Sequence, residues 1–249
     1  MRLLKWEKLP QDMQTEAVRE YYDILKKKKC GLLCKRAFDI FVSLIMLVIV
    51  SPIFLGLAIM IKIDSRGPVF YRQERITQYG KKFRIFKFRT MVVDADQMGT
   101  QITLNNDSRI TRVGKFLRKT RLDEISQLID VLRGTLTFVG TRPEVENYVN
   151  EYTDAMKATL LLPAGVTSEA SIRYKDESEL LGVAGEDADK IYVEKILPAK
   201  MKYNLQSLKT FGFWRDIKVM FMTVFAVLGK EYKDTLNTQE SKQQTEDRE

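Results

Sequence analysis

The chain of 249 residues is long enough to bury a core without disulfides or metals, and it fits one domain with appendages or two small domains. With 45% hydrophobic and 30% charged residues, its composition excludes a disordered chain and a multi-span membrane transporter. The sequence has a formal net charge of +8 and no histidine, which excludes imidazole-based catalysis and His-ligated zinc or haem. Acid, base and nucleophile roles therefore fall to Asp, Glu, Lys, Tyr or Cys.

Residues 1–36 form the first segment, for which we expect a basic, amphipathic helix. Apolar side chains such as Trp6, Val18 and Tyr22 alternate there with lysine and arginine, a pattern that suits an anionic membrane surface. The two cysteines, Cys30 and Cys34, are four residues apart, where a disulfide has poor geometry, and two thiols make no metal site. We interpret them as small hydrophobic residues of a chain kept in a reducing compartment.

A run of 22 residues without charge, Ile40–Ile61, is long enough to span a bilayer. Lysines and arginines flank both ends, and positive residues prefer the cytoplasmic side. Near the midpoint, Pro52 removes a helical hydrogen bond and the Ser51 hydroxyl can satisfy a freed carbonyl. We therefore expect residues 37–63 to form a re-entrant helix, broken at Ser51-Pro52, that enters and leaves on the cytoplasmic face. A kinked full crossing and a buried helix of a soluble core are the alternatives.

The middle of the chain predicts a β-hairpin and then a helix. Residues 69–71 and 83–88 have strand character on either side of a turn at Gly80. Apolar residues at helical spacing follow Asp123 and Glu124, and Gly134 is a typical residue after a helix end. Asp123 and Glu124 are therefore expected to open this helix.

The C-terminal third predicts further helices. Residues 161–165 have the composition of a loop, and residues 191–208 predict helices broken at Pro198. Residues 211–228 predict an apolar, aromatic-rich amphipathic helix that suits a membrane interface or a partner helix, and leaves room for a homodimer. The polar tail from residue 235 should be disordered. The expected fold class is α+β, mostly helical with a small β-hairpin.

Positive charge is concentrated in residues 62–150, which hold 17 Lys or Arg and 10 Asp or Glu, so that +7 of the net charge lies there. Arginine forks bind phosphate in a bidentate manner, so this segment predicts a phosphate-rich ligand. The sequence has no Walker A loop and no GxGxxG. A solvated surface that touches lipid headgroups, and nucleic acid binding, are the alternatives from charge alone.

Two adjacent carboxylates, Asp123 and Glu124, directly follow the cationic stretch 118–121 at the expected helix start. Asp123 could act only as a helix N-cap. In the functional interpretation, a helix N-terminus with nearby arginines binds phosphate and keeps a carboxylate ionised, and hence nucleophilic. Such a carboxylate can attack phosphorus, while its neighbour holds Mg²⁺. The triplet Asp94-Ala95-Asp96 has the DxD spacing of metal-dependent nucleotide-sugar enzymes, but it is common by chance.

Several motifs in one order resemble the bacterial sugar transferases known as monotopic phosphoglycosyl transferases, over about residues 33–232. The motifs are Lys35 to Asp39, Ser51-Pro52, Gly67 to Arg75, Phe83 to Met91, Asp107 to Gly114, Leu117 to Thr120, Leu122 to Glu124, Gln127-Leu128 and Val139-Gly140. The resemblance implies a catalytic domain over 64–232, after the 1–36 and 37–63 segments and before a tail over 233–249.

The resemblance also implies a reaction. A phosphosugar passes from a UDP-sugar to polyprenyl (undecaprenyl) phosphate at the cytoplasmic face of the bacterial inner membrane, and UMP leaves first. The course is ping-pong, through an aspartyl-phosphosugar intermediate, and it begins the assembly of a glycoconjugate (capsule, O-antigen, exopolysaccharide or glycoprotein). N-acetylated or deoxygenated hexoses, galactose and glucose all remain open as the sugar.

The resemblance carries site roles onto matching residues. Asp123 is implied as the nucleophile and Glu124 as the Mg²⁺ ligand, and the positions implied to hold phosphate are Arg118 and Arg142, with Lys87 and Arg89 as further candidates. The segment 165–174 resembles a family loop that touches the nucleotide or sugar.

Three motifs depart from the family pattern, in part by smaller changes at Ile125, Leu136 and Thr137. Thr141 stands in place of a proline before Arg142, Ser126 stands in place of a proline after Ile125, and Thr135 replaces an aspartate. Only one of these changes, Thr135 in place of the family's aspartate, removes a charged group. Two other functions are alternatives to this enzyme. A membrane-tethered nucleic-acid-binding protein has no recognisable reader motif here, so we expect no nucleic acid partner, and a non-enzymatic scaffold would recruit partners through the helix containing Trp214.

Overall fold

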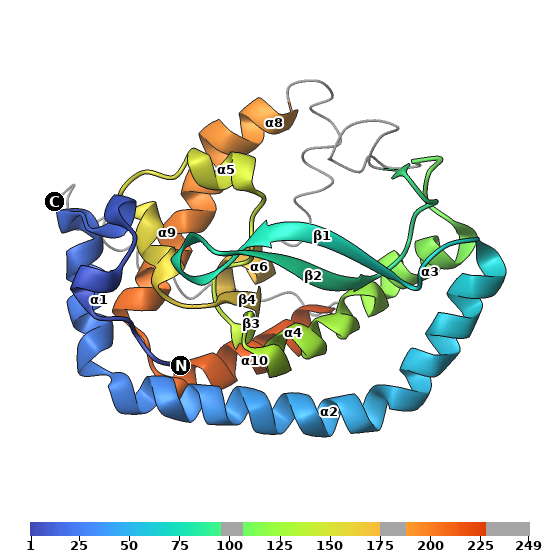
Figure 1. Ribbon diagram of the computed structural model, residues 1–249, viewed down its shortest axis with the longest axis horizontal. Coiled ribbons are helices and arrows are strands. Elements are labelled where there is room, and N and C mark those ends of the chain that lie inside the picture. The colour runs from blue at the N-terminus through green and yellow to red at the C-terminus, as the bar shows by residue number, and fades with distance from the viewer. Residues whose placement is uncertain (96–106, 175–187, 228–249) are drawn as a thin grey trace, which may run out of the picture.

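The computed structural model describes residues 1–95, 107–174 and 188–227, and most of them are helical (Figure 1). The expected disordered tail and Asp96 of the DxD triplet lie outside the described residues. The α-helices are α1 (Glu16–Lys27), α2 (Lys29–Asp64), α3 (Arg112–Thr120), α4 (Leu128–Arg133), α5 (Glu146–Asn150), α6 (Glu169–Arg173), α8 (Ala188–Ile191), α9 (Leu197–Lys209) and α10 (Phe213–Val227). The strands are β1 (Phe70–Ile76), β2 (Lys82–Phe88), β3 (Leu136–Val139) and β4 (Ala164–Thr167), and short 3₁₀ helices include η3 (Gln78–Gly80), η5 (Leu122–Gln127) and η6 (Met156–Leu161).

The N-terminal segment packs into the body of the protein. Helix α1 begins at Thr15, whose hydroxyl accepts a hydrogen bond from the Val18 amide. Its apolar face, which includes Val18 and Tyr22, is buried in a cluster with residues of η6 and α9. The predicted helix is therefore found over Glu16–Lys27, whereas the residues before it form only short 3₁₀ turns and those from Lys29 belong to α2. Its apolar side chains Val18 and Tyr22 pack against protein.

Helix α2 is continuous over Lys29–Asp64, so the expected break at Ser51-Pro52 is not found and the helix is longer than the predicted 37–63. Figure 1 shows it running beneath the other elements and then turning towards α3. Pro52 lies inside the helix, and the Ser51 hydroxyl donates to the Val48 carbonyl at 2.8 Å. Within the described residues, α2 is the one helix long and apolar enough to cross a membrane, by length and composition alone. Most of its large apolar side chains are exposed, among them Phe41, Val48 and Ile49.

Three charged residues bind the start of α2 to the body. Lys35 is buried, and its ammonium donates to the Val139 carbonyl at 2.8 Å and to Asp216 on α10 at 2.5 Å. Arg36 donates to two carbonyls at the C-terminal end of α4, and Asp39 accepts from the Thr137 hydroxyl at 2.8 Å. The motif at residues 35–39 thus joins the long helix to α4, β3 and α10.

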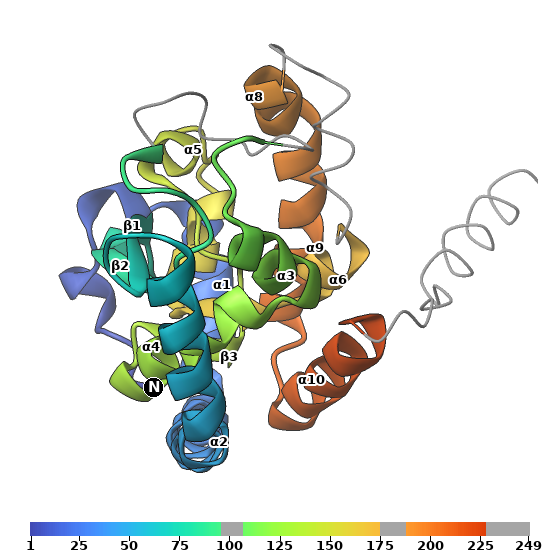
Figure 2. The same cartoon turned by 90° about the vertical axis from the view of Figure 1, so that its right-hand side faces the viewer.

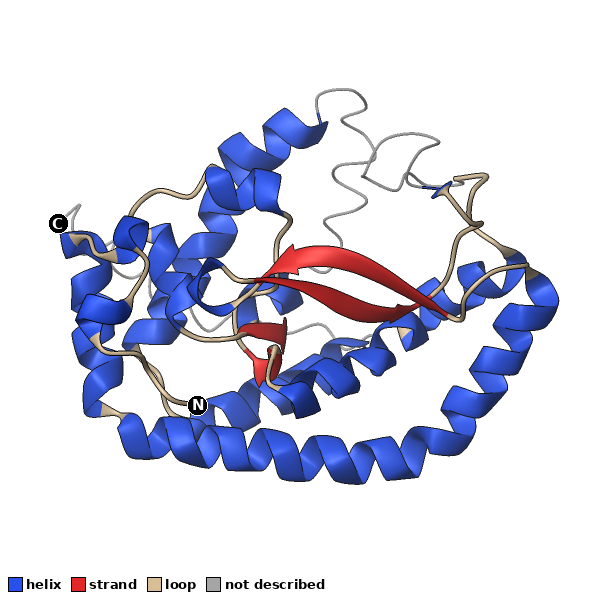
Figure 3. Cartoon of the chain, viewed as in Figure 1, coloured by secondary structure: helices blue, strands red, loops and turns tan. Residues whose placement is uncertain are grey.

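The sheets are two separate pairs (Figure 3). Strands β1 and β2 form the predicted antiparallel hairpin, in a register that pairs Phe70 with Phe88 and Ile76 with Lys82. Strands β3 and β4 form a parallel pair, with Leu136 opposite Ala164. This second pair was not predicted, and residues 164–165, expected in a loop, belong to it. A four-residue buried strand has too short an apolar pattern to separate it from a loop.

The C-terminal helices differ from the prediction in one respect. Instead of a break at Pro198, a π-helical turn over Tyr192–Ile196 leads directly into α9, in whose first turn Pro198 lies. Proline has no amide hydrogen to donate and is tolerated in a first turn. Helix α10 confirms the amphipathic helix predicted there, and 80% of the Trp214 surface is exposed. Figure 2 shows α10 beside the end-on view of α2.

Candidate active site

The two adjacent carboxylates lie on the 3₁₀ helix η5, which follows α3 through Arg121 in a left-handed conformation (φ 57°). The predicted helix therefore begins as a 3₁₀ helix and becomes α-helical only at Leu128, and it ends at Gly134 as expected, with φ 86°. The tight turn at Arg121 directs the chain back beneath β2. Asp123 and Glu124 are thus placed between α3 and the hairpin.

Two side chains attach this segment to β2. The Asp130 carboxylate accepts the Phe86 amide at 2.7 Å, and the Ser126 hydroxyl donates to the Phe86 carbonyl at 3.0 Å. Asp130 and Ser126 therefore satisfy the backbone of Phe86 on the edge of β2 that faces away from β1. These two residues were missed by the sequence reasoning. Lys87, the next residue of β2, is held beside Glu124 as a result.

Glu124 lies between two cations. The Glu124 Oε1 atom accepts hydrogen bonds from Arg142 Nη2 at 2.5 Å and from Lys87 Nζ at 3.1 Å. Burial alone would raise the pKa of Glu124, but the charges of Arg142 and Lys87 outweigh burial and hold the pKa below its usual range. Glu124 is therefore ionised at neutral pH. Arg142 and Lys87 both bind Oε1, and no described residue donates a hydrogen bond to Oε2.

Asp123 has a different environment from its neighbour. Its Oδ1 atom is buried and has no hydrogen-bond partner among the described residues. Burial, and then the negative charge of Glu124, raise the pKa of Asp123, while Lys87 and Arg118 oppose the rise. The sequence reasoning expected nearby cations and a helix N-terminus to favour the ionised carboxylate. The direction of the pKa is the reverse, because burial is the largest effect.

Arg118 is fixed beside Asp123 by the close packing of α3 on the end of β2. Its Nε atom donates to the Thr90 hydroxyl at 2.9 Å. A Cβ atom at Gly114 would lie 2.0 Å from the Thr90 carbonyl oxygen, so only glycine permits this approach of the helix. Burial lowers the pKa of Arg118, and the charge of Asp123 opposes this. Thr90 and Gly114 were not singled out from the sequence, although both lie in quoted motifs.

Arg89 and Asp94 lie apart from this group. The Arg89 guanidinium donates to the backbone carbonyls of Ser65, at 2.8 Å, and of Arg66, at the C-terminal end of α2. Asp94 is exposed, with φ 60°. The structure therefore brings together Lys87, Arg118, Asp123, Glu124 and Arg142, but gives Arg89 a structural contact with the end of the long helix.

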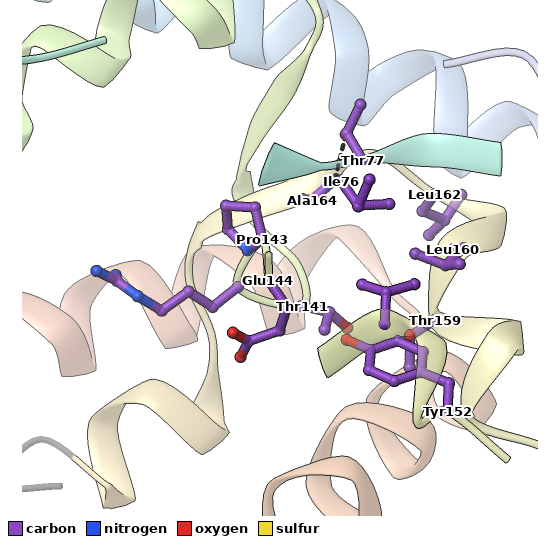
Figure 4. Close-up of a pocket in the computed structure, with 12 residues that line it drawn as sticks. Ile76, Thr77, Thr141, Pro143, Glu144, Tyr152, Thr159, Leu160, Leu162 and Ala164 are labelled. Atoms are coloured by element: carbon purple, nitrogen blue, oxygen red, sulfur yellow. Dashed lines mark hydrogen bonds between the residues drawn. The ribbon is translucent and has the colours of Figure 1, made fainter. Parts of the chain in front are cut away.

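Two of the substituted positions have side-chain hydrogen bonds. The Ser126 hydroxyl donates to the Phe86 carbonyl, as described, and lies 3.4 Å from the Asp123 carbonyl, and the Thr135 hydroxyl donates to the Asp130 carbonyl at 3.2 Å. The segment 165–174 comprises β4 and α6, and Glu169 within it pairs with Arg215 of α10 at 2.9 Å. The segment around Arg142 borders a cavity of about 10 Å³, near the size of one water (Figure 4).

The donor set for a metal at this site consists of two carboxylates. Within the described ranges, no group of three or more Cys, Asp or Glu side chains is arranged to hold a metal ion. Mg²⁺ commonly binds one or two protein carboxylates and takes its other ligands from substrate phosphates and water. The Glu124 Oε2 atom, which is not hydrogen-bonded to a described residue, fits that pattern and leaves Asp123 outside the metal's ligands.

Comparisons with known proteins identify relatives over most of the chain. A UDP-glucose:undecaprenyl-phosphate glucose-1-phosphate transferase of Escherichia coli (strain K12) is 36% identical, covering 78% of this chain and 40% of the relative. A UDP-N-acetylgalactosamine-undecaprenyl-phosphate N-acetylgalactosaminephosphotransferase of Aeromonas hydrophila is 32% identical, covering 78% and 43%. A galactosyl transferase, CpsE, of Streptococcus agalactiae serotype III (strain NEM316) is 32% identical, covering 83% and 45%.

These relatives are longer proteins, and the chain spans less than half of the length of each. The family model described as "Bacterial sugar transferase" matches residues 30–230, which include α2, the hairpin, the carboxylate pair and α10. The resemblance seen in the motifs is thereby confirmed. The chain belongs to the bacterial sugar transferase family.

Proposed function

We propose that the protein transfers a phosphosugar from a UDP-sugar to undecaprenyl phosphate and releases UMP. The observation that carries this proposal is the buried carboxylate of Asp123 beside an ionised Glu124, with Lys87, Arg118 and Arg142 around them. The names of the relatives above support a UDP-sugar as donor and undecaprenyl phosphate as acceptor. Those relatives use different sugars, so family membership leaves the sugar open.

The reaction proceeds in two displacements at one phosphorus atom. First, a carboxylate oxygen of Asp123 forms a bond to the sugar-linked phosphorus, and the bond to the bridging oxygen breaks, so that its electron pair leaves with UMP. An oxygen of undecaprenyl phosphate then attacks the same phosphorus, and the Asp123 carboxylate leaves. The raised pKa of Asp123 supports this role, because a more basic carboxylate is a better nucleophile once it is ionised.

The cations around the carboxylates neutralise the phosphates. Phosphoryl transfer depends mainly on positioning and charge neutralisation, which the guanidinium groups of Arg118 and Arg142 supply without a histidine. Mg²⁺, when bound, would act as a Lewis acid and offset the negative charge of the donor diphosphate. Glu124 would hold the ion through Oε2, since Lys87 and Arg142 bind Oε1.

The membrane placement rests on α2. The proline inside the helix at position 52, the exposed apolar side chains and the basic residues at both ends support a re-entrant helix at the cytoplasmic face of the bacterial inner membrane. The acceptor phosphate lies at the headgroup plane of the same membrane. A helix that enters and leaves on one side would hold the carboxylate pair at that height, where both a soluble donor and a lipid acceptor can reach it.

The test is UMP release by the purified protein in a bilayer mimic, with undecaprenyl phosphate, Mg²⁺ and a panel of UDP-sugars. We expect release with at least one sugar, and a fall of about 10³-fold or more in Asp123→Asn. Asp154→Asn is the matched control, because Asp154 is an exposed carboxylate paired with Lys157. Without acceptor, a sugar phosphate should add to Asp123 and be found by mass spectrometry. Full turnover in Asp123→Asn would show that another group is the nucleophile.

A further inference from the structure

The segment 141–144 carries Arg142 to Glu124, and its backbone is held at both ends. Its first carbonyl accepts a hydrogen bond from the Gly165 amide at 2.8 Å, and its last carbonyl accepts from the Ile76 amide at 2.9 Å. These two bonds tie the segment to β4 and to β1. They leave the middle of the segment, where Arg142 lies, to be fixed by side chains.

The side chain of Glu144 is the main attachment of this segment to the C-terminal helices. Glu144 is buried, and its Oε1 atom accepts a hydrogen bond from the Tyr192 hydroxyl at 2.6 Å. Lys200 Nζ lies 3.5 Å from the same oxygen and donates to the Tyr192 hydroxyl at 3.0 Å. Arg75 Nη1 lies 3.8 Å from the other carboxylate oxygen and donates to the Pro143 carbonyl at 3.3 Å. The carboxylate two residues after Arg142 is therefore surrounded by three partners.

The π-helical turn explains why Tyr192 and Lys200 can meet. In a regular α-helix, residues eight apart point about 80° away from each other around the axis. The turn over Tyr192–Ile196 inserts roughly one residue, which reduces this angle to about 20° and places both side chains on the face towards Glu144. Turns of π-helix are common at functional sites, and this one allows Tyr192 and Lys200 to contact Glu144 in the segment that carries Arg142.

We propose that Tyr192 and Lys200 are positioning residues which, through Glu144, set the place of Arg142 on Glu124 and on the donor phosphate. The proposal rests on the function proposed above. Neither residue contacts Glu124 in any of the bonds described, so their effect would pass through the backbone between Glu144 and Arg142. A misplacement of about 1 Å in a group that orients substrate can cost about 10²-fold in rate. The competing explanation is that the network only stabilises a buried charge.

The chain offers a matched pair of variants for the test. Tyr192→Phe removes the hydroxyl bound to Glu144 and keeps the ring. Tyr148→Phe is the control, because its ring lies 4.5 Å from that of Tyr192 and its hydroxyl binds Asp189 instead, at 2.5 Å. Both variants lose one hydroxyl from the same aromatic cluster, although the hydrogen bond of Tyr192 is buried and that of Tyr148 is exposed. Only the first loses a contact to the Arg142 segment.

We expect Tyr192→Phe to lower kcat for UMP release by about tenfold or more, and Tyr148→Phe to leave it within about twofold. The decisive measurement is a double-mutant cycle with Arg142→Lys. If Tyr192 acts by placing Arg142, Tyr192→Phe should have little further effect once Arg142 is replaced. Independent, additive losses would overturn the proposal, as would an unchanged kcat in Tyr192→Phe.

A second readout does not depend on turnover. The side-chain Nε–Hε resonance of Arg142, assigned by its loss in Arg142→Lys, should shift in Tyr192→Phe and stay in place in Tyr148→Phe. If the resonance shifts in Tyr192→Phe but the wild type releases no UMP from any UDP-sugar, the proposed function is contradicted and the positioning role of Tyr192 is supported. Normal UMP release by the wild type, with an unmoved Arg142 resonance in Tyr192→Phe, would overturn the positioning role and leave the proposed function standing.

Discussion

At the scale of single residues, neighbouring carboxylates are given opposite electrostatic environments. Glu124 has two cationic partners on one oxygen, which lower its pKa despite burial. Asp123 is buried beside that negative charge, and its pKa is raised. Because one carboxylate is kept ionised and the other made more basic, the pair separates into a group that can hold a cation and a group that can attack phosphorus.

This separation predicts a pH dependence. Asp123 must be ionised to attack, so kcat/KM for the donor should rise with pH through the pKa of Asp123, which lies above the ordinary value for aspartate. Glu124→Gln removes a negative charge that raises this pKa, and should move the acid limb to lower pH. Lys87→Met removes a positive charge that lowers it, and should move the limb to higher pH. Shifts of the same sign in the two variants would contradict the assignment.

At the scale of elements, sequence reasoning succeeded where a pattern was long. It predicted the hairpin, the helix ended by Gly134 and the apolar helix α10. It missed β3 and β4, because four buried residues carry no readable period and their pairing is between distant segments. In the site, the sequence predicted which charged residues are candidates but not where their side chains lie. Arg89 was a candidate together with Lys87, and yet it binds the C-terminal end of α2.

The membrane path proposed for α2 can be tested with cysteine labelling. Cys30 and Cys34 are exposed near its start, and Ser65, at its end, can be changed to cysteine in a variant that lacks the native pair. In a re-entrant helix, a membrane-impermeant maleimide should label both ends from the cytoplasmic side alone. Pro52→Ala restores a helical hydrogen bond and should favour a full crossing, which exposes the Ser65 end on the opposite side. Labelling of the two ends from opposite sides in the wild type would establish a crossing instead.

At the scale of the whole molecule, exposed apolar surface is concentrated on the two helices α2 and α10. Among the described residues, the large exposed apolar side chains on α2 are Leu33, Ile40, Phe41, Leu44, Ile45, Met46, Val48, Ile49, Ile53, Leu55, Ile59, Met60 and Ile63, and those on α10 are Trp214, Phe221, Val224, Phe225 and Val227. Three more, Val92, Val93 and Phe116, lie outside these two helices. An apolar surface of this extent is typical of a membrane contact or a protein interface. A homodimer through α10 stays a prediction, and so does a shared membrane contact, which would account for both helices together.

The two tryptophans allow this contact to be measured. Trp214 is 80% exposed on α10, whereas Trp6 packs against Tyr22 in the N-terminal cluster, with the rings 5.1 Å apart. Trp6→Phe leaves Trp214 as the single fluorophore, and its emission should be blue-shifted and quenched by brominated lipids in vesicles. Trp214→Phe leaves Trp6, which is partly buried against the N-terminal cluster, so its emission should be less quenched than that of Trp214. If Trp6 were the more strongly quenched of the two, the N-terminal segment would be the membrane contact and α10 would be free to bind a protein partner.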